Sequence, residues 1–312
     1  MHESALMRWV IDERVRRSKR FVKRVLSKTI LHPFRHSFLH WRVGLRISKS
    51  SLLQDGMAAL PSFRWIDAPH GHFYADPMLF QHEGKTWLFV EDYLYEPNEA
   101  RCILAGEVYD DGRIGPFMPV LTTERHVSYP LVFRHENEIY MVPETSDDRM
   151  IRLYRAVHFP FVWLFEHVLF PHAAYDTTPL YHEGTWYFFT TIPERGVDRR
   201  VPHLFWADSL TAKWHLHPAS PIGPQDEGRG AGPIFREDGR LIRPTQCGRP
   251  VYGYSFSFDE VLCLDRETFS QRRLATFEPT WHRHLRGMHT YGRAGRVEVI
   301  DGCWGVNAYD VM

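Results

Sequence analysis

The sequence has only four cysteines, no net charge and no long apolar stretch. No two of the cysteines form a Cys-x-x-Cys pair, which argues against a zinc ribbon or a redox dithiol. The N-terminus lacks the short apolar segment of a secretory signal peptide, and no run of about 18 apolar residues is present to span a membrane. A formal net charge of zero disfavours a nucleic-acid partner. We therefore expect a cytoplasmic protein with no nucleic-acid partner, no cofactor and no metal site.

Aromatic residues, in contrast, are abundant. They make up 14% of the 312 residues, ten of them tryptophan, and hydrophobic residues together reach 44%. Aromatic and β-branched residues favour strands, and this composition is sufficient for a packed core. The length suits one large all-β domain or two ordinary domains.

A strand–turn–strand pattern recurs about every 50 residues. Its successive turns lie at Gly84, Asn137, Gly184, Gly239 and Gly295. Each turn follows a short Pro- or Thr-containing motif and precedes an aromatic or β-branched run of strand length. Five regular copies predict an all-β fold, a five-bladed β-propeller, because a β-sandwich does not explain so regular a repeat.

The N-terminal segment differs from the rest of the chain. We predict two parts, a basic amphipathic segment at 1–40 and the propeller at 41–312. Apolar residues in the first part recur at helical spacing, and Pro33 would end that short basic N-terminal helix. Such a helix either binds an anionic membrane surface through residues 1–32, at the inner face of the membrane, or packs as a solvated helix on the domain.

The first strand of each blade of a propeller lines the central channel, so equivalent positions on these strands meet around its axis. Aligning the turns places Asp76, Tyr129, Asp176 and Ala231 at corresponding positions, with His289 close to the equivalent place. Buried carboxylates are costly unless they are paired or solvated, which favours a functional role for the two aspartates. The alternative is that they cap turns between blades, as aspartate often does.

Two glutamates follow return strands at corresponding places, Glu91 in the first copy and Glu144 in the second. A pair of carboxyl groups flanking a sugar ring is the usual requirement for breaking or forming a glycosidic bond. We predict Asp76 as base or nucleophile, Glu144 as acid, and Asp176 as the residue that orients substrate or tunes a pKa.

Further polar residues cluster in the same motifs and are predicted to contact substrate. Arg243 either clamps a phosphate or carboxylate or forms an ion pair between blades. His289 either bonds a sugar hydroxyl, serves as an acid, or is structural. The full predicted binding set is Glu91, His126, Tyr129, Arg229, Arg243, Gln246, Tyr252 and His289.

These motifs together resemble a known family. His126–Pro130, Tyr140–Glu144, Asp176–Thr178, Arg243–Gln246 and His289–Tyr291 are similar to the N-terminal domain of plant glucosamine inositolphosphorylceramide transferases and its bacterial relatives. That family's fold is similar to the five-bladed propellers of family 43 and family 32 glycoside hydrolases, whose acidic triad lies at the channel mouth. The plant proteins also carry a separate glycosyltransferase domain.

The resemblance and the carboxyl groups together lead to two hypotheses. The first is an intracellular carbohydrate-active enzyme that acts on a glycosidic bond by transfer, phosphorolysis or hydrolysis, in surface-polysaccharide or glycolipid assembly. Its partner would be a sugar, nucleotide sugar or glycolipid. The second is a non-catalytic sugar-binding or scaffold propeller. An enzyme should bring Asp76 and a second carboxyl group together in an open pocket, whereas a scaffold should bury such groups in ion pairs.

Overall fold

The computed structural model describes residues 37–95, 101–193 and 200–307. The predicted basic N-terminal helix lies outside these residues, so this prediction stays untested. The predicted domain boundary at residue 40 also stays a prediction. Within the described residues, no helix has both the length and the apolar character needed to cross a membrane.

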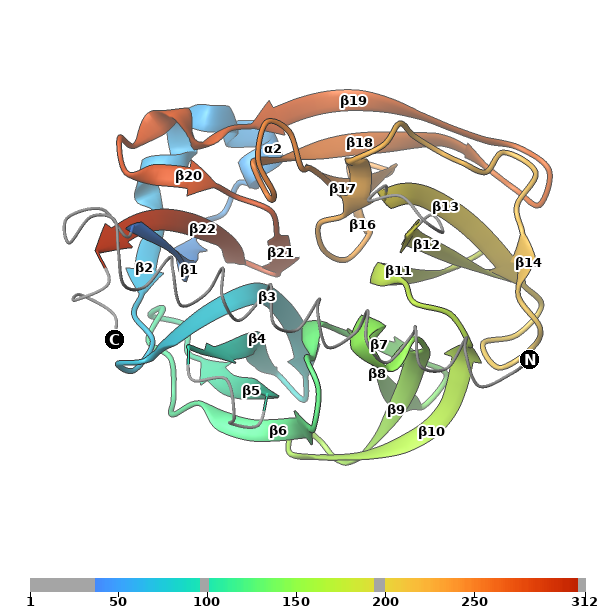
Figure 1. Cartoon of the computed structure of the whole chain (residues 1–312), viewed down its shortest axis with the longest axis horizontal. Helices are drawn as coiled ribbons and strands as arrows, with labels where there is room; N and C mark the ends of the chain where they lie inside the picture. The colour runs from blue at the N-terminus through green and yellow to red at the C-terminus, as the bar shows by residue number, and fades with distance from the viewer. Residues whose placement is uncertain (1–36, 96–100, 194–199, 308–312) are drawn as a thin grey trace, which may run out of the picture. The chain divides into compact units, whose positions relative to one another are not determined.

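Five antiparallel sheets are arranged as blades around a common axis (Figure 1), which confirms the predicted propeller. The first blade in chain order contains β3 His72–His82, β4 Lys85–Leu94, β5 Arg101–Val108 and β6 Met118–Thr123. The second contains β7 Ser128–His135, β8 Glu138–Glu144, β9 Ile151–His158 and β10 Val162–Phe170. The third contains β11 Tyr175–His182, β12 Thr185–Pro193, β13 Arg200–Ala207 and β14 His215–Leu216.

The fourth blade differs because its innermost strand is broken in two. Both β15 and β16 pair with β17. The blade contains β15 Glu227–Gly230, β16 Phe235–Glu237, β17 Arg240–Cys247, β18 Ser255–Leu264 and β19 Phe269–Phe277.

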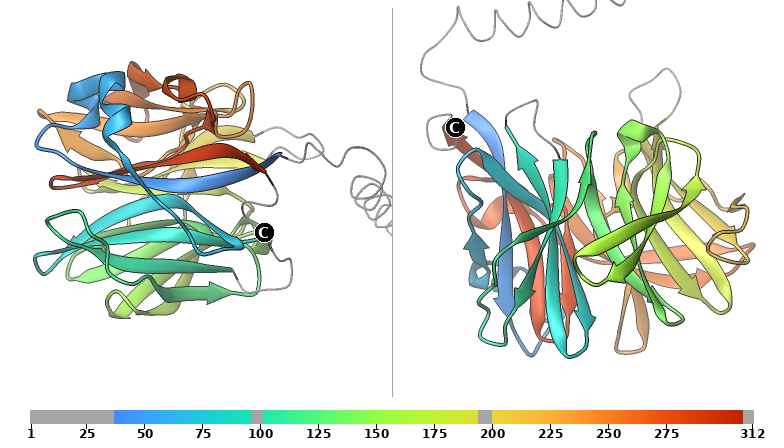
Figure 2. Two further views of the ribbon diagram at one scale, coloured as in Figure 1. Left: turned by 90° about the vertical axis from the view of Figure 1, so that its left-hand side faces the viewer. Right: turned by 90° about the horizontal axis from the view of Figure 1, so that it is seen from below.

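The fifth blade closes the ring. Its strands come from both ends of the described chain, with β1 hydrogen-bonded between β2 and β22. It contains β1 Ser37–Ile47, β2 Arg64–Ile66, β20 Leu285–Gly287, β21 Tyr291–Ala294 and β22 Val297–Asn307. The short helices are α2 Leu52–Asp55, η1 Gly56–Ser62, η2 Ser146–Asp148 and η3 Pro279–Trp281. Figure 2 shows the strands running along the axis that the blades surround.

The hydrophobic core lies between neighbouring blades. Met78 and Phe89 of the first blade pack with Met141 and Trp163 of the second, all of them buried. Burying a side chain such as Phe89 contributes about 1.5–3 kcal/mol, so these layers stabilise the contacts between blades.

The inner strands of the first three blades share one backbone distortion. Asp76, Tyr129 and Asp176 have φ values of 50°, 47° and 47°, in the left-handed region that residues with a Cβ rarely adopt. At each of them the pairing register with the next strand shifts, which marks a β-bulge. The equivalence predicted from the turn spacing is therefore present in the backbone. A bulge re-aims a side chain, and strain of this kind tends to lie at functional sites.

Candidate active site

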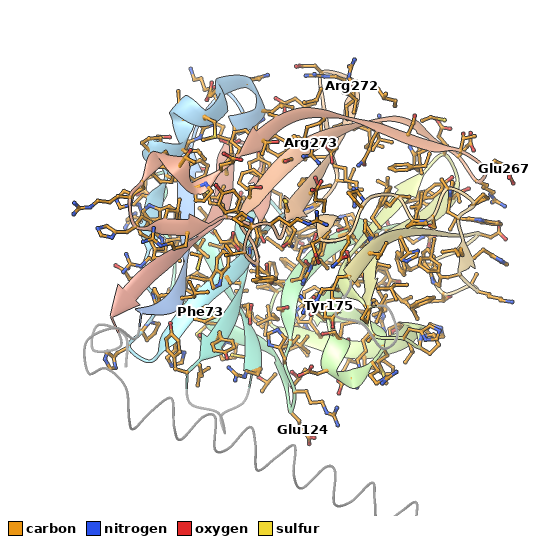
Figure 3. All side chains as sticks on the ribbon, turned by 45° about the horizontal axis from the view of Figure 1, so that its top comes forward. Phe73, Glu124, Tyr175, Glu267, Arg272 and Arg273 are labelled. Atoms are coloured by element: carbon orange, nitrogen blue, oxygen red, sulfur yellow. The ribbon has the colours of Figure 1, made fainter. Side chains whose placement is uncertain are left out.

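Side chains of one blade bind the backbone of the next at the centre of the ring. The Tyr129 N–H donates to Oδ2 of Asp76 at 3.0 Å, and the Asp176 N–H donates to Oε2 of Glu144 at 3.1 Å. The Asp76 N–H in turn donates to Oδ2 of Asp301 at 3.3 Å. We call Asp76, Glu91, Glu144, Asp176 and His289 the hub. Figure 3 labels Phe73 on β3 and Tyr175 on β11, which belong to different blades. Phe73 comes three residues before Asp76, and Tyr175 comes directly before Asp176.

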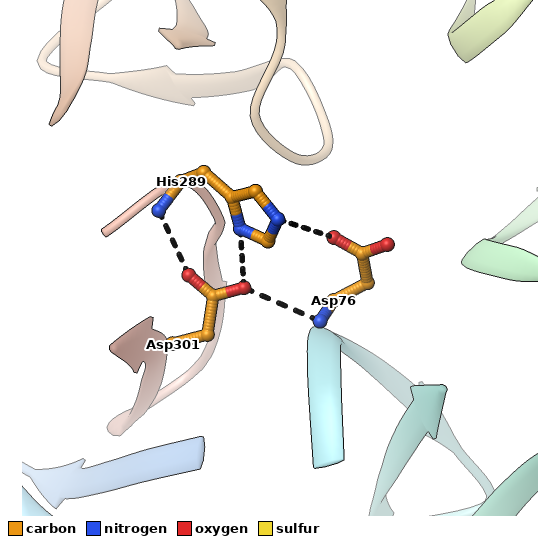
Figure 4. A group of neighbouring side chains, drawn as sticks. All are labelled: Asp76, His289 and Asp301. Carbon is orange, nitrogen blue, oxygen red and sulfur yellow. Dashed lines mark hydrogen bonds and ion pairs between the residues drawn. The ribbon is translucent and has the colours of Figure 1, made fainter. Parts of the chain in front are cut away.

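One side of the hub is an aspartate–histidine–aspartate arrangement (Figure 4). Nδ1 of His289 lies 2.5 Å from Oδ2 of Asp301, and its Nε2 lies 3.8 Å from Oδ1 of Asp76. Asp301 also accepts the backbone N–H groups of His289 and Thr290 at 2.8 and 2.9 Å. The Trp41 indole stacks on the imidazole, with ring centroids 4.0 Å apart.

This arrangement favours a charged imidazole. Burial lowers the pKa of His289, but the charge and hydrogen bond of Asp301, and then the charge of Asp76, raise it to about 9. Both ring nitrogens face carboxylate oxygens. An ionised carboxylate can only accept hydrogen bonds, so the doubly protonated ring offers an N–H to the carboxylate on each side. Burial raises the pKa of Asp76, while His289 opposes that rise.

The same three residues also present ligand atoms within 4.8 Å of one another, which is close enough to consider a metal ion. However, Nδ1 of His289 is already bonded to Asp301, and both Asp301 oxygens accept backbone N–H groups. Only Nε2 and Asp76 are left, which is fewer ligands than a protein metal site usually offers. The group is better described as a hydrogen-bonded charge network.

The other side of the hub is organised by Arg229. Its guanidinium donates to Oδ1 and Oδ2 of Asp176, the first at 3.0 Å, and to Oε2 of Glu144 at 3.1 Å. Nε2 of Gln246 donates to the same Asp176 carboxyl at 2.7 Å. The Arg229 guanidinium also lies over the rings of Tyr175 and Tyr252, at 5.0 and 5.6 Å from their centroids. Glu144 and Asp176 are therefore paired within the protein.

The pKa of Asp176 reflects competition between burial and this arginine. Burial raises the pKa, Arg229 lowers it, and Glu144 raises it again, to about 7. A carboxyl group that titrates near neutrality is suited to proton transfer.

Tyr129 is fully buried and joins three blades. Its hydroxyl lies 2.8 Å from Oγ1 of Thr178 and accepts the N–H of Gly232 at 2.8 Å. Tyr129 was predicted to contact substrate, but its hydroxyl is instead bonded to Thr178 and Gly232 within the protein.

Arg243 also lies inside the fold. It is 2% exposed, donates to the carbonyl oxygen of Gly228 and to Gln271, and lies over the Phe189 ring. Burial lowers the pKa of this arginine to about 10. Neither of its two predicted roles describes this position, because its close partners among the described residues are a carbonyl, an amide and a ring.

A cavity of about 270 Å³ adjoins the Arg229 side of the hub. Three of the predicted binding residues line it, namely Arg229, Gln246 and Tyr252. The remaining lining residues are Thr191, Arg200, Pro202, Asp226, Glu227 and Gly248. Tyr252 is half exposed, and its ring edge faces His289. The cavity thus combines a half-exposed aromatic ring with amide, guanidinium and carboxylate groups, the combination that polyhydroxylated ligands need.

Three residues that complete the hub escaped the sequence predictions. Asp301 lies in an apolar run of β22, Thr290 was noted only as part of a motif, and Trp41 marked only the start of the propeller. Thr290 donates its hydroxyl to Oδ1 of Asp76 at 2.9 Å. A charged residue between Ile300 and Gly302, in a strand that is otherwise buried, was a usable signal for Asp301.

The hub predicts an unusual dependence of stability on pH. Asp76, Glu91 and Asp176 have pKa values raised by burial, so the folded state holds their protons more tightly than the unfolded chain. His289, at about 9, does the same. Stability should therefore fall as pH rises from about 5 to 9. We expect the melting temperature to be several degrees higher at pH 5.5 than at pH 9.

The His289→Gln variant is the control for this prediction. It should lose the imidazole's share of the decline between pH 7 and 9 and so show a smaller decline over this range. A melting temperature that is constant over this range in the unaltered protein would contradict the assigned protonation states.

The chain is similar in sequence and in fold to known proteins. Residues 65–285 match the family described as "Glucosamine inositolphosphorylceramide transferase 1, N-terminal". "Glucosamine inositolphosphorylceramide transferase 1" of Oryza sativa subsp. japonica is 31% identical over 206 residues, which cover 64% of this chain and 28% of the relative. The chain thus spans less than a third of the relative's length.

One solved structure shares the fold. "Zg3597, a family 117 glycoside hydrolase, produced by the marine bacterium Zobellia galactanivorans" is similar with a TM-score of 0.53, over 85% of this chain and 90% of the other, at 9% identity. The α-L-arabinanase of Cellvibrio cellulosa gives a TM-score of 0.47 over 72% of this chain and 82% of its own, also at 9% identity.

Proposed function

Because the chain belongs to the glucosamine inositolphosphorylceramide transferase family through its N-terminal domain, we propose that it is a carbohydrate-active enzyme that acts on a glycosidic bond. The observation that carries the proposal is the convergence of four buried carboxyl groups from three blades beside a cavity with sugar-binding chemistry. Asp76 serves as base or nucleophile, since it is backed by a charged His289. The substrate is a sugar, a nucleotide sugar or a glycolipid.

The cavity supports a position for the sugar ring. Tyr252 offers a half-exposed aromatic ring on which the C–H face of a sugar packs, and Gln246 and Arg229 stand at the boundary with the hub. For a sugar ring bound there, Gln246 and Arg229 lie between the ring and the Asp176 carboxyl group, to which both side chains donate. The reaction belongs to the assembly of a surface polysaccharide or glycolipid in the cytoplasm.

A specific observation favours the second candidate, a non-catalytic sugar-binding propeller. Glu144 and Asp176 are both engaged by Arg229, and all four hub carboxyl groups are at most 7% exposed. Such pairing is what a scaffold would show. The two candidates share the cavity and differ in whether Asp76 acts chemically.

The experiment that separates them compares the unaltered protein with Asp76→Asn on a panel of nucleotide sugars, aryl glycosides and oligosaccharides. Product release and binding are both measured. We expect turnover by the unaltered protein and a loss of about 10²-fold or more in Asp76→Asn, with binding largely kept. Binding with no turnover in either protein would establish the sugar-binding candidate. Failure of the whole panel to bind would contradict both.

We also propose that residues 1–32 hold the protein at an anionic membrane. Eight basic residues between positions 14 and 28 support the proposal, each worth about 1 kcal/mol near such a surface: Arg14, Arg16, Arg17, Lys19, Arg20, Lys23, Arg24 and Lys28. The full chain should float with liposomes that contain anionic lipid, and should be released at high salt. Equal flotation of a variant lacking residues 1–32 would remove the segment from this role.

A further inference from the structure

Glu91 holds an exceptional position in the hub. It lies on β4 opposite Ala75, which directly precedes the bulge at Asp76, and it is 7% exposed. Among the described residues, no hydrogen bond is formed by its carboxyl group. Nδ1 of His126 lies 3.6 Å from its Oε1.

The other three hub carboxyl groups all receive hydrogen bonds. Each is bonded by at least two donors from side chains or backbone. Asp76 accepts from Tyr129 and Thr290, Glu144 from Ser146 and Arg229, and Asp176 from Arg229 and Gln246. Donors favour the ionised form of a carboxyl group, so the ligand-free hub provides for three anions but not for a fourth.

The surrounding charges make an ionised Glu91 still more costly. Burial raises its pKa well above the usual range, and the charges of Asp76 and then Glu144 raise it further. Burial also lowers the pKa of His126, so that ring is no reliable cation at neutral pH. The charges that act on Glu91 most strongly are those of Asp76, Glu144, Arg101 and Asp176, and of these only Arg101 is a cation. That arginine is bonded to the carbonyl oxygen of Leu94 at 2.7 Å.

We propose that Glu91, and not Glu144, is the proton donor of the hub. The assignment rests on the proposed function, because it concerns the breaking of a glycosidic bond. A neutral carboxyl that has no hydrogen-bond partner within the described part of the chain keeps its O–H for a ligand oxygen, whereas Glu144 is held by Arg229 and the Asp176 N–H.

In the proposed step, every bond broken is matched by a bond formed, and each proton released is taken up by a named group. The O–H of Glu91 gives its proton to the departing glycosidic oxygen as the bond from that oxygen to the anomeric carbon breaks. A hydroxyl of the acceptor, or water, forms the new bond to that carbon and passes its proton to the Asp76 carboxylate. Return of one proton from Asp76 to Glu91 through solvent restores the starting state.

The first test needs no substrate. Protein labelled with ¹³C at the glutamate side-chain carboxyl is titrated by NMR from pH 4 to 9. One resonance should titrate well above the others, because burial raises the pKa of Glu91 while ordinary glutamates titrate near 4.3. This resonance should be absent from Glu91→Gln and present in the exposed control Glu124→Gln. If every glutamate of the unaltered protein titrates in the ordinary range near 4.3, the proposal is wrong, and this holds whether or not the variant folds.

The second test concerns the reaction. Glutamine resembles the neutral acid in shape, so Glu91→Gln should keep the stability of the unaltered protein at pH 8 or exceed it, and should keep KM within a few-fold. Its kcat should fall by about 10²–10⁴-fold. Unchanged kcat would overturn the donor role.

The two tests separate failure of the inference from failure of the proposed function. If Glu91 titrates well above the ordinary glutamates but no sugar is turned over, the raised pKa stands and the donor role falls with the proposed function. If sugar is turned over while Glu91 titrates near 4.3, the proposed function stands and the inference alone is overturned.

Discussion

Replacing Arg229 by methionine is expected to destabilise the propeller by about 3–5 kcal/mol at pH 7, measured by urea denaturation. Methionine keeps much of the side-chain volume but leaves Glu144 and Asp176 as buried neighbours without a cation. The Arg229 side chain is 12% exposed, and the two carboxylates are 5% and 3% exposed, so water compensates little.

Arg272→Met is the matched control. That arginine forms an ion pair with Glu260, but it is 63% exposed, so its loss should cost at most about 1 kcal/mol. The Arg229→Met defect should shrink at pH 5, where the buried acids take up protons. Adding Asp176→Asn to Arg229→Met should restore part of the stability. If the losses in the two arginine variants are equal, Arg229 does not hold the hub together.

The second large effect is expected from Gly232→Ala. Gly232 has a φ of 132°, and a Cβ at this position would lie 2.0 Å from the carbonyl oxygen of Tyr291. Here the inner strands of the fourth and fifth blades touch, since the Tyr291 N–H donates to the carbonyl oxygen of Ala231 at 2.8 Å. Backbone on both sides leaves no flexible atom to move, so we expect a loss of about 3 kcal/mol or more.

Gly239→Ala separates this contact from backbone strain alone. Gly239 also has a positive φ, 78°, but a Cβ there would meet no atom within 4 Å. Its replacement should cost about 1–2 kcal/mol. Urea denaturation of both variants gives the comparison, and a Gly232→Ala loss no larger than that of Gly239→Ala would contradict the close approach of the two blades.

The fold was predictable because the repeat is visible in the sequence. The turns at Gly84, Gly184 and Gly239 all have positive φ, so a residue without a Cβ marks the same place in three copies. The bulges at Asp76 and Asp176 follow from the same spacing. Ring closure then brings residues together that are distant in sequence, which explains why the hub aspartates were found.

The pairing of these groups was not predictable. Whether a carboxyl group faces an arginine or a ligand depends on side-chain directions that a single sequence does not record. Arg229 and Arg243 lie on β15 and β17, two paired strands of the fourth blade. Nevertheless, Arg229 joins the hub, whereas Arg243 is bonded to Gly228. Asp301 was missed because its strand, β22, closes the ring with β1 from the other end of the chain.

The central claim is that the carboxyl groups brought together by the five blades form one site for a sugar. The most direct measurement is a crystal structure of the protein soaked with the best-bound sugar of the panel. The ring should occupy the cavity beside Gln246 and Tyr252, with a hydroxyl or glycosidic oxygen within hydrogen-bond distance of a hub carboxyl group. A sugar bound on the outer strand of a blade, with the cavity and hub unchanged, would contradict the account.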